Sequence, residues 1–294
     1  MGHYRGNVQR NAGGAPANVL VALTKLGATT AFIGKVGQDE FGHYLKSTLN
    51  ECGIDTSGIT ITNQVNTTVA FVHLDEQGDR SFSFYRNPGA DMMLETNEIP
   101  YSMIEQSKVF HCGSISMTNE PAATSTIKAL EFAKSIGLLI SFDPNLRTAL
   151  WEDLEHAKFM IQQGLFYANV LKISEEELIF LTGTSDPEKG SYEIDQNYGV
   201  SLILITLGAE GCFYRLGDRS GKIPGYRVNT IDTTGAGDAF LGGMLFQLLT
   251  RIDQLHELTN DELRSMILFA NAVGALVTTK KGTIHAMPNL TEIN

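Results

Sequence analysis

Hydrophobic and polar positions follow two periods along this chain. From about residue 105, apolar runs of strand length alternate with longer segments in which apolar residues recur every three or four positions. The short runs predict strands at residues 108–111, 138–142, 170–173 and 202–206, with two more around Cys212 and Tyr226. The longer segments predict helices at residues 121–135, 153–163, 175–181, 236–249 and 261–277.

Strands that alternate with helices indicate βαβ units, whose right-handed crossovers place successive strands side by side and parallel. We therefore expect an α/β fold with a doubly wound, mostly parallel sheet flanked by helices. Ligands of such sheets bind outside the carboxyl ends of the strands. The turns that follow the predicted strands are the first places to look for a functional site.

One segment breaks this alternation. Residues 67–75 and 81–86 alternate apolar and polar positions, and the polar turn 76–79 joins them, so they predict a β-hairpin outside the main sheet. A two-stranded hairpin is marginal by itself and must pack on something. We expect a small β lid, residues 67–86, inserted in an α/β domain of residues 1–66 and 87–294. A plain edge hairpin is the alternative, and its apolar face suggests a homodimer.

Composition narrows the class of protein. The chain has 294 residues, 43% of them hydrophobic, enough for one large globular core. Its 22 basic and 33 acidic residues give a net charge of −11, which argues against nucleic acid or an anionic membrane as a partner. The three cysteines form no metal or disulfide pattern, so we expect them to be reduced and buried. The start is no signal peptide and no apolar run spans a membrane, so a cytoplasmic enzyme or binding protein is expected.

The stretch DTTGAGDAF, residues 232–240, carries the most chemical information. It opens an apolar helix after the strand-like residues 226–231, so Gly235, Ala236 and Gly237 lie where the first helical N–H groups are unpaired. Such a helix start binds anions. A carboxylate beside it, Asp238, makes sense if it accepts a proton from a hydroxyl that attacks a bound phosphate. The alternative is a plain helix N-terminus with an acid favoured by the helix dipole.

Other phosphate signatures are missing from the sequence: it has no P-loop, no protein-kinase motifs and no dinucleotide-binding glycine motif. Instead, DTTGAGD and GGAPAN (residues 13–18) resemble the two signatures of the ribokinase-like (PfkB) carbohydrate kinases. Within this family the chain most resembles the fructokinases. The resemblance runs from about residue 11 to 288 and includes FIGKVGQDEFG (32–42), FYRNPGADM (84–92), FHCGSIS (110–116), DPNLRTALW (143–151) and KISEEELIFLTG (172–183).

The resemblance implies a role for each signature residue. Asp238 matches the base that deprotonates the sugar hydroxyl, and Gly235, Ala236 and Gly237 match the anion hole for the γ-phosphoryl group of ATP. Gly14 and Asn18 match the sugar-binding signature. From local sequence alone, the two glycines are better explained as a turn that leads a helix at residues 17–26, and only their pairing with DTTGAGD favours the sugar-binding signature.

Further positions lie after predicted strands. Arg147 suits a phosphate, and Asn145 suits a sugar or phosphate hydrogen bond, although a surface salt bridge is the alternative for the arginine. Ser174-x-x-Glu177 is a capping box. The resemblance also makes Glu177 a candidate for holding Mg²⁺ near the phosphates, largely through water.

The resemblance places ATP and a monovalent cation at three more segments. The turn TLGAEG resembles the family's turn beside ATP, with Thr206, Gly208 and Gly211 as cofactor-binding positions. Asn271 resembles an adenine-pocket residue, and an ordinary polar helix residue is the alternative. Many relatives bind a monovalent cation such as K⁺ beside the anion hole. Asp232 and the carbonyl of Thr234 match one half of that site, and the loop 278–282 lies where the other half is expected.

The resemblance departs from the family at the start of the chain. Relatives begin with a strand of the G-E-x-x-x-D type whose Asp holds sugar hydroxyls, but this chain shows only MGHYRGNVQRN before its glycines. Either residues are missing from this sequence, or a core strand and a substrate ligand are lost. The second case would expose a sheet edge and cost about 1.5–3 kcal/mol of sugar binding.

These observations lead to one main prediction and several alternatives. The main one is a Mg²⁺- and ATP-dependent kinase that phosphorylates the primary hydroxyl of D-fructose. Ribose, 2-keto-3-deoxygluconate or a nucleoside are alternative acceptors. A sugar or nucleotide sensor without catalysis, and a vitamin-type kinase of similar fold, are further alternatives.

Overall fold

The structure is a computed structural model that describes residues 10–74 and 80–293. Its central sheet has six strands in the order β10-β9-β8-β7-β6-β5. They span β5 Val109–Gly113, β6 Leu139–Asp143, β7 Val170–Ser174, β8 Leu202–Thr206, β9 Cys212–Leu216 and β10 Arg219–Ile223. Strands β5 to β8 are parallel, and β9 and β10 extend the sheet antiparallel at one edge. The predicted α/β fold with a mostly parallel sheet is confirmed.

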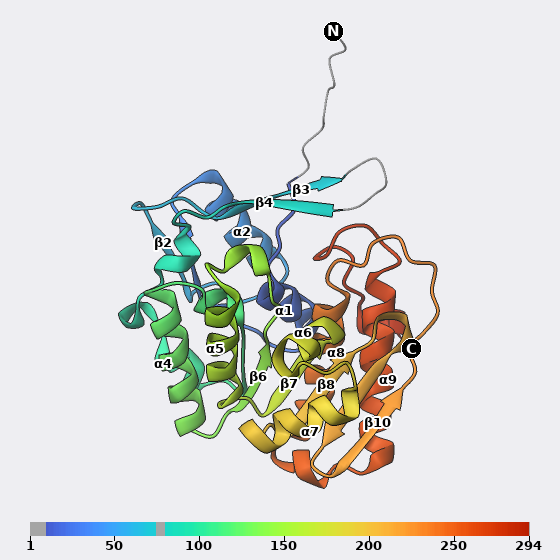
Figure 1. The fold of residues 1–294 in the computed structure, drawn as a ribbon. Helices are drawn as coiled ribbons and strands as arrows, with labels where there is room; N and C mark the ends of the chain where they lie inside the picture. Colours follow the sequence, from blue (N-terminus) through green and yellow to red (C-terminus); the bar gives the residue numbers. More distant parts are fainter. Residues whose placement is uncertain (1–9, 75–79, 294) are drawn as a thin grey trace.

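Helices cover both faces of this sheet (Figure 1). They span α1 Ala15–Lys25, α2 Glu40–Glu51, α3 Tyr101–Glu105, α4 Ala122–Ser135, α5 Leu154–Leu165, α6 Glu175–Thr182, α7 Pro187–Tyr198, α8 Ala236–Leu248, α9 Asn260–Val277 and α10 Leu290–Ile293. Residues of α4 to α7 pack in one apolar cluster, and residues of α1, α8 and α9 pack in another on the opposite face. The sheet therefore forms the middle layer of three.

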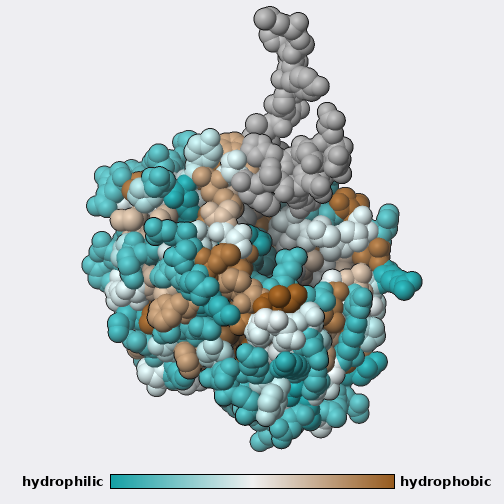
Figure 2. Space-filling model, in the orientation of Figure 1, coloured by the Kyte–Doolittle hydropathy of each residue, from teal (hydrophilic) through white to brown (hydrophobic). Residues whose placement is uncertain are grey.

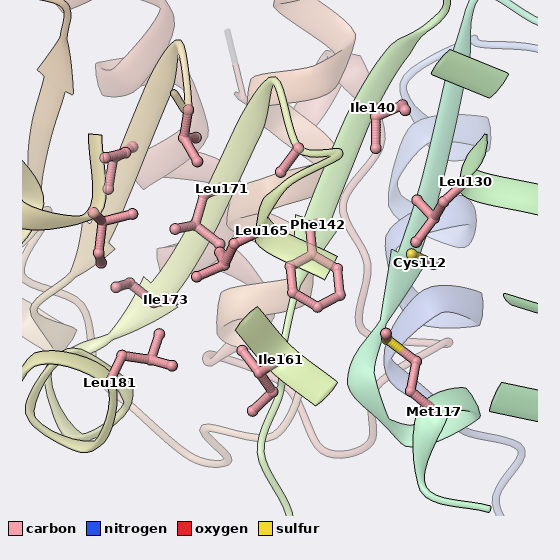
Figure 3. Packing of buried hydrophobic residues seen from close by; sticks show 14 of the residues in the cluster. Cys112, Met117, Leu130, Ile140, Phe142, Ile161, Leu165, Leu171, Ile173 and Leu181 are labelled. Carbon is pink, nitrogen blue, oxygen red and sulfur yellow. The ribbon is translucent and has the colours of Figure 1, made fainter. Parts of the chain in front are cut away.

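Successive side chains of a strand point to opposite faces of the sheet, so each strand contributes residues to both clusters. On β8, Ile203 and Ile205 belong to the first cluster, whereas Leu202 and Leu204 belong to the second. Phe142 lies at the centre of the first cluster (Figure 3). A Cβ on Gly164 of α5 would come within 2.5 Å of its ring, so only glycine lets α5 pack this closely on β6.

The remaining strands form two small sheets. β1 Gly34–Gly37 pairs in parallel with β2 Ile59–Thr62, and β3 Val69–Leu74 pairs antiparallel with β4 Arg80–Tyr85. The predicted hairpin is therefore present, while its turn at residues 76–79 lies outside the described residues. Arg86 fixes its base: the guanidinium donates to Asp91 at 2.7 Å, to Thr118 at 2.8 Å and to the Ile115 carbonyl at 3.0 Å. The division into a kinase domain and a lid stays a prediction.

The structure differs from the sequence prediction in three places. The strand predicted around Tyr226 is wrong: residues 224–230 form no strand, and the last strand is β10, which pairs with β9 and ends at Ile223. Tyr226 and Val228, the apolar residues that suggested a strand, are exposed on the surface. Helices α2 and α7 and the pair β1–β2 were not predicted. Cys112 and Cys212 are buried as expected, but Cys52 is only half-buried.

The outer surface is mainly hydrophilic on the face drawn in Figure 2. Brown apolar residues occur there in small groups. In the part of the chain that the structure describes, no helix combines the length and apolar character needed to cross a bilayer.

Candidate active site

Polar residues gather where the parallel strands end. Asp143 is the last residue of β6, Ser174 of β7 and Thr206 of β8, so their turns meet at one edge of the sheet. Helices α1 and α8 pack closely with each other on the same side. A Cβ on Gly242 of α8 would lie 2.6 Å from Cβ of Ala22 and 3.1 Å from the Val19 carbonyl oxygen. The two glycine-led helix starts therefore meet, although they are more than 200 residues apart in the sequence.

The second glycine motif forms the start of α8, as its sequence predicted. Gly235 is the N-cap in a left-handed conformation, φ 80° and ψ 4°, which favours glycine. A Cβ there would also meet Cγ2 of Thr283 at 2.3 Å. The N–H groups of the first turn, including those of Gly237 and Asp238, lie at the positive end of the helix dipole. The N–H of Ala236 donates to the Thr233 carbonyl at 3.2 Å, so the expectation that all three N–H groups of residues 235–237 are unpaired is wrong for Ala236.

Asp238 lies in the first turn of α8 and is 7% exposed. Burial, with the nearby charge of Asp143, raises its pKa to about 6, although Asn18, Lys172 and Arg147 act in the opposite direction. Its Oδ2 accepts a hydrogen bond from Asn18 Nδ2 at 2.7 Å. The carboxyl group is therefore held in place and is ionised at neutral pH, with a pKa suited to proton transfer.

The first glycine motif provides the Asn18 side of this contact. Gly14 caps α1 with φ 131°, and nothing lies within 4 Å of the position of a Cβ, so the space beside it is open. Asn18 is buried, and its Oδ1 has no hydrogen-bond partner in the described structure. A buried acceptor without a partner costs free energy, which a hydroxyl donor would relieve.

The turn after β6 places Asn145 beside the same carboxylate. Asn145 has a positive φ of 46°, and its Nδ2 donates to Oδ1 of Asp238 at 3.4 Å. Its backbone N–H donates to Oδ1 of Asp143 at 3.2 Å. Arg147 is exposed, and its charge lowers the pKa of Asp238. Within the described residues Arg147 forms no ion pair, so the salt bridge considered as its alternative is not observed there.

A cavity of about 320 Å³ lies between the base of the hairpin and residues 149–152. Its lining includes Phe84 and Arg86 from the hairpin and Leu150 and Trp151 from the segment after Arg147. This volume falls in the range of small-molecule sites. The hairpin thus borders a cavity, but Asn18, Asn145 and Asp238 do not line it.

Glu177 takes part in the capping box of α6. Its Oε2 accepts from Ser174 N–H at 2.8 Å and its Oε1 from Leu146 N–H at 2.7 Å, while Ser174 Oγ accepts from Glu177 N–H. Burial and the charge of Asp143 raise the pKa of Glu177, and Lys172 and the two N–H donors oppose this. Within the described residues, no group of three or more His, Cys, Asp or Glu side chains is arranged to hold a metal ion.

Asp232 joins the loop before α8 to the loop after α9. Its Oδ1 accepts from Thr234 N–H at 2.9 Å and its Oδ2 from Gly282 N–H at 3.3 Å. The backbone N–H of Asp232 donates to the Thr278 carbonyl at 3.1 Å. The two segments expected to share a cation site therefore lie side by side.

The positions expected near ATP are more dispersed. The turn after β8 contains Gly208 and Gly211, both with positive φ, and a Cβ on Gly211 would lie 2.2 Å from the Ile223 carbonyl oxygen. Thr206 Oγ1 donates to the Ile173 carbonyl at 3.3 Å. Asn271 is buried, and its Nδ2 donates to the Pro224 carbonyl at 3.0 Å, so it fixes the loop after β10. That contact is the structural role considered as its alternative.

Two residues of this cluster had no role in the sequence analysis. Lys172 of β7 and Asp143 of β6 form a buried ion pair, with 3.0 Å between Nζ and Oδ2, directly behind the start of α8. A lysine inside the buried strand VLKIS was the available signal, because lysine is rarely buried without a partner.

Comparison with known proteins agrees with this geometry. The model of the pfkB family carbohydrate kinases matches residues 1–290. Fructokinase-2 of Solanum lycopersicum is 45% identical over 282 residues, covering 95% of this chain and 85% of that protein. Fructokinase of Xylella fastidiosa, solved with bound ATP, has a TM-score of 0.90 and 36% identity, covering 97% of this chain and 90% of that one.

A third relative was solved with more ligands. Fructokinase of Vibrio cholerae, solved with fructose, ADP and a calcium ion, has a TM-score of 0.88 and 36% identity, covering 97% of this chain and 91% of that one. A double mutant of it, solved with fructose, ADP and a potassium ion, has the same TM-score of 0.88 and covers 97% of this chain and 90% of that one. The fold and the cluster around Asp238 define an enzyme of the kinase class. The chain belongs to the pfkB family of carbohydrate kinases.

Proposed function

We propose that this protein transfers the γ-phosphoryl group of ATP to the primary hydroxyl of D-fructose, giving fructose 6-phosphate and ADP. The observation that carries this proposal is the Asn18–Asp238 contact at the glycine-lined start of α8. It is supported by similarity to fructokinases over nearly the whole chain.

In this proposal Asp238 is the base. Its carboxylate takes the proton of the attacking hydroxyl, the hydroxyl oxygen forms a bond to the γ-phosphorus, and the bond from that phosphorus to the bridging oxygen of ADP breaks. A pKa of about 6 leaves the carboxylate ionised at neutral pH while it remains basic enough to accept the proton. The N–H groups of Gly235 and Gly237 would hold the charge on the migrating phosphoryl group, while Ala236, whose N–H donates to the Thr233 carbonyl, would fix the turn between them.

The sugar would lie between the start of α1 and the turn after β6. The open space at Gly14 admits it, and the unpaired Oδ1 of Asn18 accepts a hydrogen bond from one of its hydroxyls. Asn145 would contact a sugar hydroxyl. Arg147, exposed and without an ion pair in the described structure, would contact a phosphate oxygen.

The nucleotide would lie along the turn after β8, with Thr206, Gly208 and Gly211 at its border; Asn271 would act by holding the loop after β10. The residues present fit a magnesium ion held mainly by phosphates and water, because Mg²⁺ takes only one or two carboxylates in such sites. Glu177 would hold it through water, and the ion would neutralise phosphate charge.

A monovalent cation would lie between Asp232 with the Thr234 carbonyl and the loop 278–282. The fit is supported by the short distance between these two segments, which the Asp232 side chain joins. A cation there would strengthen the positive field at the start of α8 without touching the sugar.

The test is a coupled assay of ADP release by the purified protein with MgATP and a panel of fructose, ribose, 2-keto-3-deoxygluconate and a nucleoside. We expect turnover with fructose and a loss of at least about a thousandfold in kcat for Asp238→Asn. Asp153→Asn is the matched control, because it removes an exposed N-cap carboxylate from the start of α5. Fructose binding by calorimetry without turnover would support the sensor instead. Retained activity in Asp238→Asn would show that the base is misassigned.

Two lesser proposals complete this function. We propose a homodimer formed through the hairpin, supported by Phe71 and Tyr85, which are 38% and 69% exposed and pack edge to face. Light scattering behind a sizing column tests it. We also propose that the enzyme works in a reducing compartment such as the cytoplasm, supported by its three unpaired cysteines.

A further inference from the structure

A charged lysine lies inside the sheet directly behind the phosphate-facing turn. Lys172 is two residues after Val170 on β7, so strand alternation points both toward the face that α8 covers. Lys172 is 6% exposed. A Cβ on Gly237 would lie 2.8 Å from its Nζ and 3.1 Å from its Cε, so the ammonium group contacts the backbone of this turn from behind.

Acidic groups surround this ammonium from three elements. Asp143 of β6 accepts its hydrogen bond at 3.0 Å, and Glu177 of α6 and Asp238 of α8 lie close enough to influence it. Burial alone would lower the pKa of Lys172, but these carboxylates outweigh it and hold the pKa above the ordinary value, so the side chain is charged. His111 of β5 and Cys212 of β9 also lie near this ammonium group. Burial lowers the pKa of His111 to about 4 and raises the pKa of the Cys212 thiol, so both side chains are neutral at pH 7.

Fold stability does not explain this arrangement. A buried ion pair is often no more stable than well-packed apolar residues of the same volume, because two charges must be desolvated. Apart from Lys172 and the terminal Ser174, the strand is apolar, and Val170 of the same strand packs in the apolar cluster beside α8. The position of the charge, against Gly237 and beside Asp238, coincides with the site where negative charge gathers during phosphoryl transfer.

We propose that Lys172 is a positioning residue for this reaction, anchored by Asp143. Its ammonium supports the 235–237 turn from behind and offsets the negative charge that accumulates when phosphoryl oxygens meet the carboxylate of Asp238. Lys172 acts through the turn and the base, without contacting the sugar. This inference rests on the proposed function, since it concerns the same transfer step.

The experiment compares three variants in the coupled assay, using whichever sugar of the panel the wild-type protein phosphorylates. Lys172→Met removes the charge and keeps the length of the side chain. The double variant Asp143→Asn, Lys172→Met also removes the carboxylate that the first variant leaves unpaired. Arg215→Met is the control: Arg215 is 5% exposed and paired with Glu188, but it lies on β9 away from α8.

We expect Lys172→Met to lower kcat about 10- to 100-fold, with KM for the sugar within about threefold. In a profile of kcat against pH, the fall in kcat at low pH should begin at a higher pH than in the wild type, because Asp238 loses a neighbouring positive charge. Asp143, Arg147 and Asn18 also influence the pKa of that carboxyl group. The double variant should recover the melting temperature, and its kcat should fall off at the wild-type pH or below it, because Asp143 raises the pKa of Asp238 more than Lys172 lowers it; its kcat at neutral pH should stay low. Arg215→Met should lower stability and leave kcat unchanged.

The outcomes separate the two proposals. If the wild type phosphorylates no sugar of the panel, the proposed function fails, and this inference fails with it. If the wild type turns over and the double variant recovers full kcat, the ion pair only balances charge and Lys172 has no part in the reaction. An unchanged kcat in folded Lys172→Met overturns the inference directly.

Discussion

The hydrogen bond from Asn18 to Asp238 should set the pH at which this enzyme loses activity. At 2.7 Å it is the shortest contact of the proposed base, and it stabilises the ionised form. A hydrogen bond to a charged group contributes about 1.5–3 kcal/mol, and one pKa unit corresponds to about 1.4 kcal/mol. Asn18→Leu, which keeps the side-chain volume and removes the donor, should therefore raise the pKa of Asp238 by about one to two units.

The assay is kcat against pH between 5 and 9 at saturating sugar and MgATP. In the wild type, kcat should fall below about pH 6 as Asp238 becomes protonated. In Asn18→Leu the fall should begin about one to two units higher, so at pH 7 about half to a tenth of the enzyme has an ionised base. KM for the sugar should also rise, because the buried Oδ1 acceptor is lost.

Asn145→Ala is the matched comparison. It removes the other amide from the same carboxylate, but across a longer contact of 3.4 Å, so its acid limb should move by less than that of Asn18→Leu. If kcat falls at the same pH in the wild type and in Asn18→Leu, the reasoning is refuted, because the group that titrates is then not Asp238. A larger shift in Asn145→Ala would contradict the ranking of the two contacts.

Three further predictions concern stability and the glycine turn. The pKa of Asp238 is higher in the fold than in the unfolded chain, so this carboxyl stabilises the fold fully below about pH 4 and loses that contribution as pH rises through about 6. At pH 8, Asp238→Asn should therefore have a higher melting temperature than the wild type, and its unfolding free energy should be larger by at most about 3 kcal/mol. A lower melting temperature at that pH would contradict the assignment of the pKa shift to burial. Gly235→Ala should lower both kcat and stability, because the new Cβ would lie 2.3 Å from Thr283 and the backbone has a φ of 80°. Gly183→Ala is the control: its φ is 75°, but nothing lies near the new Cβ, so it should measure the cost of the positive φ alone. If the two variants lose equal stability in urea melts, the clash is relieved by movement. Phe142→Ala should lower the free energy of unfolding by about 3–5 kcal/mol in the same urea melts, and Gly164→Ala, which crowds the Phe142 ring, should also be destabilising. A loss under about 1 kcal/mol in Phe142→Ala would show that the surrounding side chains move to fill the cavity.

Local patterns predicted those parts of the molecule whose physics is local. The short apolar run of β8 and the capping box of α6 each depend on residues a few positions apart, and both form as expected. The glycines of the second motif indicated the start of α8 for the same reason, since the end of a helix depends only on residues next to one another in the sequence. The failure around Tyr226 has the opposite cause: an alternating segment becomes a strand only where a partner edge is free, and β10 already occupies that edge of β9.

The sequence by itself determined the α/β fold, the two glycine motifs and the family to which they belong, because each depends on spacing within a short segment. Only the tertiary structure decided which side chains meet. The bond between Asn18 and Asp238 depends on the packing of α1 on Gly242, and the contact of Lys172 with Gly237 depends on how α8 crosses the sheet. Such contacts join residues far apart in the chain, and the burial that shifts the pKa of Asp238 exists only once all the layers are assembled.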